Sequence, residues 1–537
     1  MEVVDSKEIE KRKSKIKNFF LGWIKDNYDK TFLVVLILAL ILRIWIFTKT
    51  LDQALWFDTA EYLSTGKYWA GMSSHMSDIW YYRRGFLWPL FSAFFFKIGL
   101  GESTIRFTEV IFSTGIVFLT YRLISIVYNK KLALASSIAM TFSWVLFFFS
   151  GRPMTDIPAS FFILLSLLFF WKGYVKVTNK KHMMLFGIFL AIAVLIRMQT
   201  LIFIPCFIVY AFTKEKFKFL KNKKLWLAIL MFAIMLIPHF VIYNHNFGNP
   251  VKDMASHYLG FNVEGTVSHN EQGGFSKMLM YFPDIPYLLF GSPQGPFTSF
   301  LKLAFTLIFL LGAFMFFGNL FLGFDKIFSN KKLQRDLFVL SWFIIPYLLL
   351  GRMAGLVEQR YFIAIMPFLF AIFLTPFLNL GKLNIFKNKK KFFVIILLIA
   401  LLFIPNLQWG NQLTEMKKTS YHELKLAGEW LKENSDLQDV IVTNSFPQIS
   451  YYSERRVATF SGGLRNPEDH LGVISQEEFN EFMQQEKPRF IVLSIFENHK
   501  DWMYSYPKDN PNWIPVIAFP PTTQPLLIIY EYQINNA

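Results

Sequence analysis

Charged side chains are scarce in this chain of 537 residues. Asp, Glu, Lys and Arg together make up 17% of the sequence, hydrophobic residues make up 53%, and phenylalanine alone occupies 63 positions. Soluble globular proteins carry roughly 25% charged residues. The composition therefore excludes an ordinary soluble protein and predicts a polytopic α-helical membrane protein.

Cysteine is almost absent as well. The single cysteine, Cys206, lies inside an apolar run, which excludes a disulfide framework. A small-residue cleavage site is also missing after the charged residues 1–30, and the next apolar segment is long enough to span a bilayer. We therefore expect a membrane anchor and not a cleaved signal peptide.

The excess of basic residues gives a net charge of +17. The lysines are clustered in short loops between apolar segments, which is the pattern of cytoplasmic loops beside anionic lipid. The charge therefore predicts membrane topology, and no nucleic-acid partner is expected.

The lysine clusters also decide how the chain crosses the membrane. Residues 86–100 are apolar but short and contain Pro89. If they spanned the bilayer, every later lysine cluster would lie outside, so we interpret them as an interfacial or re-entrant helix. About eleven spans then alternate consistently from a cytoplasmic N-terminus: 31–48, 104–127, 132–149, 157–174, 183–195, 200–212, 225–243, 300–322, 337–350, 360–380 and 392–408.

We expect three regions. Residues 1–30 form a cytoplasmic segment, residues 31–411 a transmembrane module with external loops 49–103 and 244–299, and residues 412–537 an extracytoplasmic domain. In the last region, helical spacing of Leu424, Ala427, Trp430 and Leu431 and short apolar runs predict a small α/β domain with strands at 439–443, 489–493 and 526–530.

Acidic residues stand out in the predicted external loops. Asp58 and Glu61 are three residues apart and would share one face of a helix, and Asp156 immediately precedes a predicted span. A positioned carboxylate can remove the proton from a hydroxyl as that hydroxyl attacks. Two simpler interpretations stay open: the first pair could be solvated acids on an interfacial helix, and Asp156 could cap the helix that follows.

Arginine is the second unusual feature of these loops, because lysine is rare in them. Guanidinium groups bind phosphate through paired hydrogen bonds. Acids that face several arginines suit a ligand that is both anionic and hydroxylated, such as a sugar attached to a lipid phosphate. For any single arginine, a position at the end of a span is the alternative explanation. The external arginines are Arg83, Arg84, Arg197, Arg352 and Arg360.

Motifs typical of metal sites are missing from the predicted external side. It contains no clustered Asp-x-Asp pair and no His-x-x-x-His. A monophosphate leaving group needs less countercharge than a diphosphate, so arginines could suffice; no cofactor is expected, and a divalent metal is left open. The external histidines, among them His239, are interpreted as surface residues.

Several short motifs follow one another along the chain and share this predicted external placement. On these motifs the chain resembles the GT-C superfamily of polyprenyl-phosphate-sugar-dependent transferases, in particular the dolichyl-phosphate-mannose protein mannosyltransferase family (glycosyltransferase family 39) and the aminoarabinose transferases that modify lipid A. The motifs are Phe57-Asp58-Thr59-Ala60-Glu61-Tyr62, Arg84 before Pro89-Leu90, Arg106, Thr155-Asp156-Ile157-Pro158, Arg197, Glu358-Gln359-Arg360-Tyr361 with Pro367, and Ile449-Ser450-Tyr451-Tyr452-Ser453-Glu454-Arg455-Arg456.

The resemblance implies roles for individual residues. Asp58 matches the catalytic acid of the first external loop, Asp156 the second external acid, and Arg84 and Arg360 basic positions near the lipid phosphate. We group Arg83, Arg197 and Tyr361 with these phosphate-binding residues.

The chain departs from the family in three places. Thr59 follows Asp58 where many relatives have Glu, which leaves the role of Glu61 open. Loop 244–299 is too short for the β-trefoil of eukaryotic members. Residues 412–537 lack the Trp-Trp-Asp signature, which argues against the oligosaccharyltransferase branch.

The expected function is that of an integral cell-membrane glycosyltransferase. It would move one sugar, a hexose or a pentose, from a polyprenyl (dolichyl or undecaprenyl) phosphate to an acceptor hydroxyl on the extracytoplasmic face, with inversion. The acceptor could be a glycan, a lipid or a protein. The alternative is a transporter or lipid flippase, but such proteins place ionisable residues near the bilayer midplane and use paired repeats, which this sequence does not show.

Overall fold

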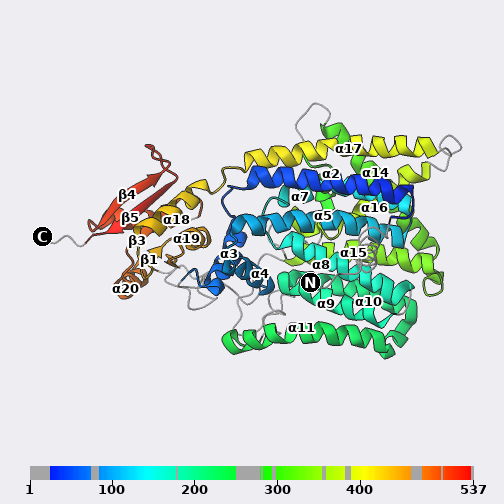
Figure 1. Cartoon of the computed structure of the whole chain (residues 1–537), viewed down its shortest axis with the longest axis horizontal. Coiled ribbons are helices and arrows are strands. Elements are labelled where there is room, and N and C mark those ends of the chain that lie inside the picture. The colour runs from blue at the N-terminus through cyan, green and yellow to red at the C-terminus, as the bar shows by residue number, and fades with distance from the viewer. Residues whose placement is uncertain are drawn as a thin grey trace, which may run out of the picture.

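A bundle of long helices carries a small α/β domain at one end (Figure 1). The computed structural model describes residues 24–73, 84–176, 179–249, 279, 282–292, 298–353, 358–380, 389–460, 475–497 and 500–533. The helices of the bundle are α2 (Asn27–Thr50), α5 (Glu102–Val127), α6 (Lys130–Phe142), α7 (Trp144–Phe149), α8 (Asp156–Phe170) with the π-helical turn η1 (Trp171–Lys176), α9 (Lys180–Ile196), η2 (Met198–Phe203), α10 (Ile204–Glu215), η3 (Lys216–Lys221), α11 (Lys223–Phe247), α14 (Thr298–Leu322), α15 (Lys331–Met353), α16 (Met366–Leu380) and α17 (Lys389–Met416).

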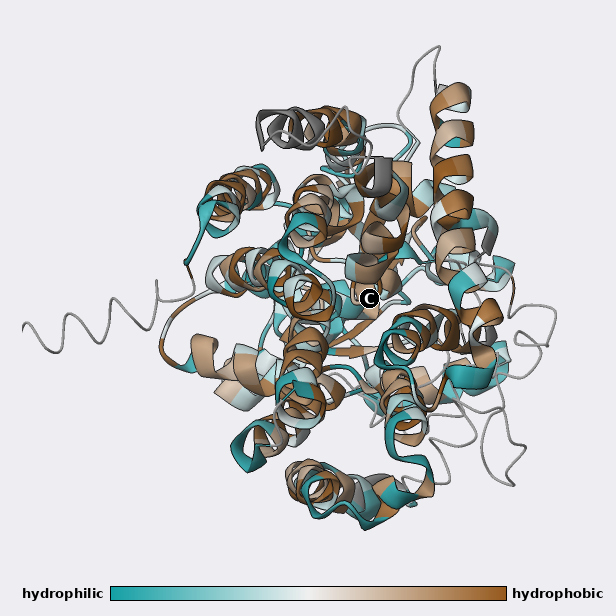
Figure 2. Cartoon of the chain, turned by 90° about the vertical axis from the view of Figure 1, so that its right-hand side faces the viewer, coloured by the Kyte–Doolittle hydropathy of each residue, from teal (hydrophilic) through white to brown (hydrophobic). Residues whose placement is uncertain are grey.

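The polytopic helical architecture predicted from the sequence is confirmed. Each of the eleven predicted spans overlaps one of these helices or two consecutive ones, although the helix in the predicted span 360–380 begins only at Met366. Among the described residues, six helices are by themselves long and apolar enough to cross a membrane. Hydrophobic residues, coloured brown, make up much of the helices when the bundle is viewed from the end opposite the α/β domain (Figure 2).

Two short helices, α3 (Phe57–Ala70) and α4 (Leu87–Lys97), lie at the end of the bundle that carries the α/β domain (Figure 1). Helix α4 has 11 residues, which is too few to cross a bilayer of about 30 Å at 1.5 Å per residue. Gly66 of α3 allows the two helices to pack closely, since a Cβ atom there would come within 2.9 Å of Ser92 Cβ. Helix α3 ends at Gly71 in the left-handed conformation, a common helix stop.

The predicted span 132–149 is broken into α6 and α7. Ser143 has a non-helical ψ of 122°, and the carbonyl groups of Met140 and Thr141 accept hydrogen bonds from Arg43 of α2 at 3.2 and 2.6 Å. The fully buried guanidinium satisfies carbonyl groups that a helix end leaves free. The break sets the direction of α7, which leads directly into residues 150–155.

The C-terminal domain is built on a five-stranded mixed sheet in the order β2-β1-β3-β5-β4. Strands β2, β1 and β3 are parallel, and β5 runs antiparallel to β3 and β4. The three predicted strands and the predicted helix are confirmed; β2 and β4 were missed. The elements are α18 (His422–Asn434), β1 (Val440–Val442), α19 (Phe446–Ser453), β2 (Arg456–Ala458), α20 (Gln476–Glu486), β3 (Phe490–Ser494), α21 (Asp501–Asp509), β4 (Trp513–Phe519) and β5 (Leu527–Tyr532).

One surface prediction is wrong. His239 is buried in α11, and its ring stacks on Phe86 with 5.6 Å between the ring centroids. Phe86, which directly precedes α4, packs in one cluster with apolar residues of α9 and α11, and this cluster covers the histidine. Most of the predicted loop 244–299 lies outside the described residues.

Candidate active site

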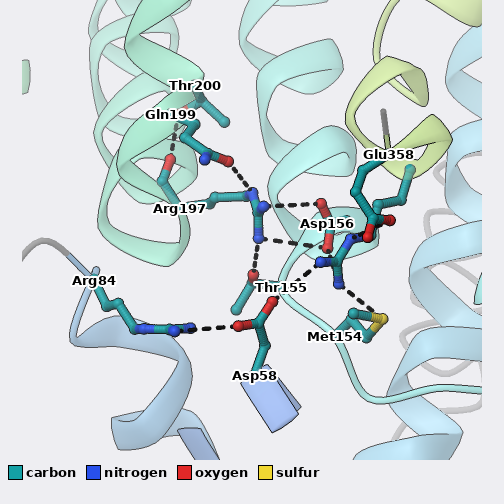
Figure 3. Close-up of polar contacts among 10 residues, drawn as sticks. Asp58, Arg84, Met154, Thr155, Asp156, Arg197, Gln199, Thr200 and Glu358 are labelled. Atoms are coloured by element: carbon teal, nitrogen blue, oxygen red, sulfur yellow. Dashed lines mark hydrogen bonds and ion pairs between the residues drawn. The ribbon is translucent and has the colours of Figure 1, made fainter. Parts of the chain in front are cut away.

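Four segments that are far apart in the sequence meet at the end of the bundle near the α/β domain (Figure 3). They are the first turn of α3, the start of α8, the turn between α9 and η2, and the 3-10 helix η8 (Gln359–Phe362). These segments bring together Asp58, Asp156, Arg197 and Arg360, all of which the sequence nominated, and Arg84 joins them from the residues before α4.

Asp58 lies between two guanidinium groups. Its Oδ1 is 3.1 Å from Arg84 Nη2, and its Oδ2 is 3.1 Å from Arg360 Nη2. The side chain retains 32% exposure. Burial opposes ionisation of Asp58, but Arg84, Arg360 and Arg197 outweigh it and hold the pKa of this carboxyl well below its usual range. Asp58 is therefore ionised at neutral pH.

Glu61 lies one helical turn behind Asp58 and is fully buried. Its Oε2 is 2.9 Å from Arg84 Nη2, so one guanidinium serves both acids of α3. Burial is the main cause that raises the pKa of Glu61 to about 7; Arg84 opposes this rise, and the charge of Asp58 adds to it. The two neighbouring acids thus have pKa values displaced in opposite directions.

Asp156 is the first residue of α8 and is also buried. Its carboxylate lies 3.4 Å from Arg197 and 3.7 Å from Arg360. Asp156 is not the N-cap of α8: that position is Thr155, whose side chain makes no capping hydrogen bond. Thr155 Oγ1 accepts a hydrogen bond of 2.8 Å from Arg197, which fixes the guanidinium at the helix start.

Arg360 connects the two acidic positions, since it contacts both Asp58 and Asp156. Its Nε is also 3.4 Å from Glu358. The neighbouring Tyr361 places its ring 5.0 Å from the Arg197 guanidinium and 5.5 Å from that of Arg360. Burial is the largest influence on the pKa of Arg360 and lowers it, but the acids overcome this and raise the pKa above its ordinary value.

Four contacting residues were not nominated as site residues: Met154, Thr155, Gln199 and Glu358. Gln199 accepts a hydrogen bond of 2.7 Å from Arg197 Nε. Glu358 and Thr155 belong to the sequence motifs that contain Arg360 and Asp156, so their position next to a nominated residue could have identified them. Nothing in the sequence separates Gln199 from other polar residues.

A pocket opens beside these groups. Asp156, Arg197, Arg360 and Tyr361 form its polar side. Residues of α8, η2 and α15 and one residue before α16 form the rest, and most of them are apolar: Ala159, Ser160, Ile163, Gln199, Thr200, Ile202, Phe203, Leu350 and Ala364. A site with this division suits an amphiphilic ligand with an anionic head.

Two glycines bring backbone segments of the site into close contact. A Cβ atom on Gly85 would overlap the carbonyl group of Leu195, so the residue after Arg84 lies directly against the end of α9. A Cβ atom on Gly151 would overlap the hydroxyl oxygen of Thr50. The segments that carry Arg84, Arg197 and Asp156 are thus placed by backbone contacts in addition to ion pairs.

Two nominated arginines are not placed by the structure. Arg83 lies outside the described residues, and the side chain of Arg352 is likewise not described. Within the described part of the chain, no group of three or more His, Cys, Asp or Glu residues has the geometry to hold a metal ion. The acids of the site instead contact arginines.

Comparisons with known proteins identify the fold. Residues 83–242 match the family model described as dolichyl-phosphate-mannose-protein mannosyltransferase. ArnT from Cupriavidus metallidurans bound to undecaprenyl phosphate aligns with a TM-score of 0.61 at 10% identity, over 95% of this chain and 98% of that chain. No curated protein sequence matches the chain.

Structures of the oligosaccharyltransferase from Archaeoglobus fulgidus are also similar. The complex of AglB with an inhibitory peptide and a dolichol-phosphate aligns with a TM-score of 0.54 at 14% identity, over 90% of this chain and 71% of that chain. The complex with Zn and sulfate aligns with a TM-score of 0.56 at 14% identity, over 89% and 69%. The resemblance expected from the motifs is confirmed: the chain has the GT-C fold, and its residues 83–242 match the dolichyl-phosphate-mannose-protein mannosyltransferase family model.

Proposed function

We propose that this protein is a membrane glycosyltransferase that moves one sugar from a polyprenyl phosphate to an acceptor hydroxyl. The observation that carries the proposal is the convergence of Asp58 and Asp156 with three arginines beside a largely apolar pocket. Solved structures with the same fold contain undecaprenyl phosphate or dolichol-phosphate, which have the anionic head and apolar chain that this pocket suits.

The arginines supply countercharge for the phosphate. Arg197 and Arg360 line the pocket, and guanidinium groups stabilise the negative charge that a leaving phosphate develops. Without a ligand, these groups are paired with Asp156 and Asp58. A bound phosphate would compete with the acids for the same donors.

This competition gives Asp58 its role as the general base. Its low pKa keeps it ionised but weakly basic while Arg84 and Arg360 contact it. When the phosphate draws Arg360 away, the carboxylate regains proton affinity, while Arg84 stays paired with Glu61. The acceptor oxygen then attacks the anomeric carbon, the bond from that carbon to the phosphate oxygen breaks with its electron pair on the phosphate, and Asp58 takes the hydroxyl proton. Attack opposite the leaving group inverts the anomeric centre.

Asp156 and Glu61 complete the arrangement. Asp156 holds Arg197 and Arg360 at the mouth of the pocket and orients the donor or the acceptor. Glu61 is too deeply buried to touch a substrate, so its part is to hold Arg84 in reach of Asp58. Arg83 is proposed as a further phosphate contact on its sequence position alone.

The lysine clusters support an orientation of the chain. Helices α6, α11 and α15 begin with Lys130, Lys223 and Lys331. These helices begin at the end of the bundle opposite the α/β domain (Figure 1). By the positive-inside rule, that end is cytoplasmic. The site and the C-terminal domain would then face the extracytoplasmic side, where the acceptor hydroxyl is found.

The proposal is tested by donor consumption. Purified protein in lipid nanodiscs is incubated with radiolabelled polyprenyl-phosphate sugars and mixed acceptors, and release of the free lipid phosphate is followed. We expect cleavage of at least one donor. If no donor is cleaved, while labelled lipid moves between the leaflets of reconstituted vesicles, the protein is a lipid transporter and the proposal is wrong.

A further inference from the structure

The C-terminal domain packs directly against the helix that carries Asp58. Helix α19 lies beside α3 (Figure 1). Phe446 contacts the ring of Phe57 edge-on at 5.2 Å, at the start of both helices. Further along, the hydroxyl groups of Ser64 and Ser450 are 3.1 Å apart. The contacts with α19 therefore extend from the first turn of α3 to its middle.

A buried lysine closes the far end of this contact. Lys67 Nζ is 2.8 Å from Glu454, donates to the carbonyl group of Tyr451 at 2.9 Å, and lies 3.9 Å from the centre of the Tyr451 ring. Both charged side chains are about nine-tenths buried. A buried pair of this kind is strongly disrupted when one partner is removed, because the other charge is left without compensation.

Glu454 also ties the contact to the rest of the domain. Its second carboxylate oxygen is 2.7 Å from Lys432 of α18. The residue has a φ of 58°, in the left-handed region that favours glycine. The carboxylate of Glu454 therefore contacts both Lys67 of the catalytic module and Lys432 of the C-terminal domain.

A second contact holds the chain just before α3. The hydroxyl oxygen of Tyr452 accepts a hydrogen bond of 2.8 Å from the backbone N–H of Leu55, three residues before Asp58. On its other side α3 is packed tightly against α4 at Gly66. The position of Asp58 relative to Arg360, about 300 residues later, therefore depends on α4 and on the C-terminal domain.

We infer that the C-terminal domain is a positioning device for α3, in which Lys67 and Tyr452 fix the carboxylate of Asp58 for the reaction. The inference rests on the proposed function. It also assigns a task to the motif 449–456, whose contacts hold α3 in place: Ser450, Tyr451, Tyr452 and Glu454 each touch α3 or the residues before it.

The test compares Lys67→Met and Tyr452→Phe with Arg456→Met in the full-length protein. Arg456 pairs with Glu486 of the same domain at 2.7 Å and makes none of the α3 contacts named above, so its variant is the control for loss of an ion pair within the domain, although this pair is more exposed than that of Lys67. We expect the first two variants to lower kcat about tenfold or more while KM for the donor changes less than twofold, since small displacements of reacting groups have large kinetic effects. Lys67→Arg, which keeps the charge, should restore most of the turnover.

Hydrogen exchange of the α3 amides is measured in parallel and does not depend on any reaction. We expect faster exchange in Lys67→Met and Tyr452→Phe, and wild-type exchange in Arg456→Met. The inference is wrong if Lys67→Met and Tyr452→Phe both show wild-type exchange of α3 or both show wild-type kcat. If Lys67→Met does not fold, Tyr452→Phe alone tests the inference, since it removes only one oxygen atom. If the wild-type protein cleaves no donor, the proposed function fails, and the exchange data still decide whether the domain holds α3.

Discussion

The displaced pKa of Glu61 makes a quantitative prediction. Burial raises this pKa from 4.5 to about 7. A tenfold change in proton affinity is worth about 1.4 kcal/mol, so full ionisation of Glu61 costs the folded state about 3 kcal/mol relative to the unfolded state. Glu61→Gln removes the titration while it keeps the shape of the side chain.

The direction of the pH effect on stability follows from the difference in bound protons between the folded and unfolded states. Between pH 4.5 and 7 the folded protein holds a proton on Glu61 that the unfolded chain has released, so the stabilisation present at low pH is lost as the pH rises through this window. Wild-type protein should therefore lose about 2 to 3 kcal/mol of stability relative to Glu61→Gln between pH 5 and pH 8.

The assay is thermal unfolding of both proteins in nanodiscs, followed by tryptophan fluorescence from pH 5 to pH 8. The melting temperature of the wild type should fall relative to that of Glu61→Gln as the pH rises. Glu415→Gln is the control. The Glu415 carboxylate accepts a hydrogen bond from Lys49, which lowers its pKa below the tested range, so its difference from wild type should stay constant. A constant difference for Glu61→Gln as well would refute the assigned electrostatics of α3.

Two further predictions concern the placement of Arg84, which precedes Gly85, and the binding role of Arg197. Gly85→Ala places a methyl group against the carbonyl of Leu195 and should lower donor turnover about tenfold without removing any polar contact. Gly318→Ala is the control and should keep wild-type turnover, because a Cβ atom there would meet open space. Equal rates for the two variants would contradict the proposed close packing at Gly85. Arg197→Lys keeps the charge but loses the fork that contacts Thr155, Asp156 and Gln199, so we expect the donor KM to rise about tenfold, and an unchanged KM would remove Arg197 from the phosphate site.

Much of the helical architecture could be predicted because its signals are local. Apolar runs bounded by lysines marked the helices, and the three-residue spacing of Asp58 and Glu61 correctly placed both on one side of α3, where they share Arg84. The length and proline of residues 86–100 correctly marked a helix too short to span. Each of these features depends on a few neighbouring residues.

The features that were missed depend on distant partners. The break at Ser143 is stabilised by Arg43 from another helix, about a hundred residues earlier. Strand β4 contains Pro515 beside an irregularity in the ladder, a residue that normally argues against a strand. The pairing of Lys67 with Glu454 joins two regions that the sequence assigned to separate domains.

The central claim is that the Asp58 carboxylate removes the acceptor proton. The most direct measurement is single-turnover cleavage of a radiolabelled polyprenyl-phosphate sugar by wild type and by Asp58→Asn, with donor binding measured separately. The amide keeps the size of the side chain but cannot take the proton, so cleavage should be about a hundredfold slower or more while the protein folds and binds donor normally. Cleavage by Asp58→Asn at a rate near that of wild type would contradict the account.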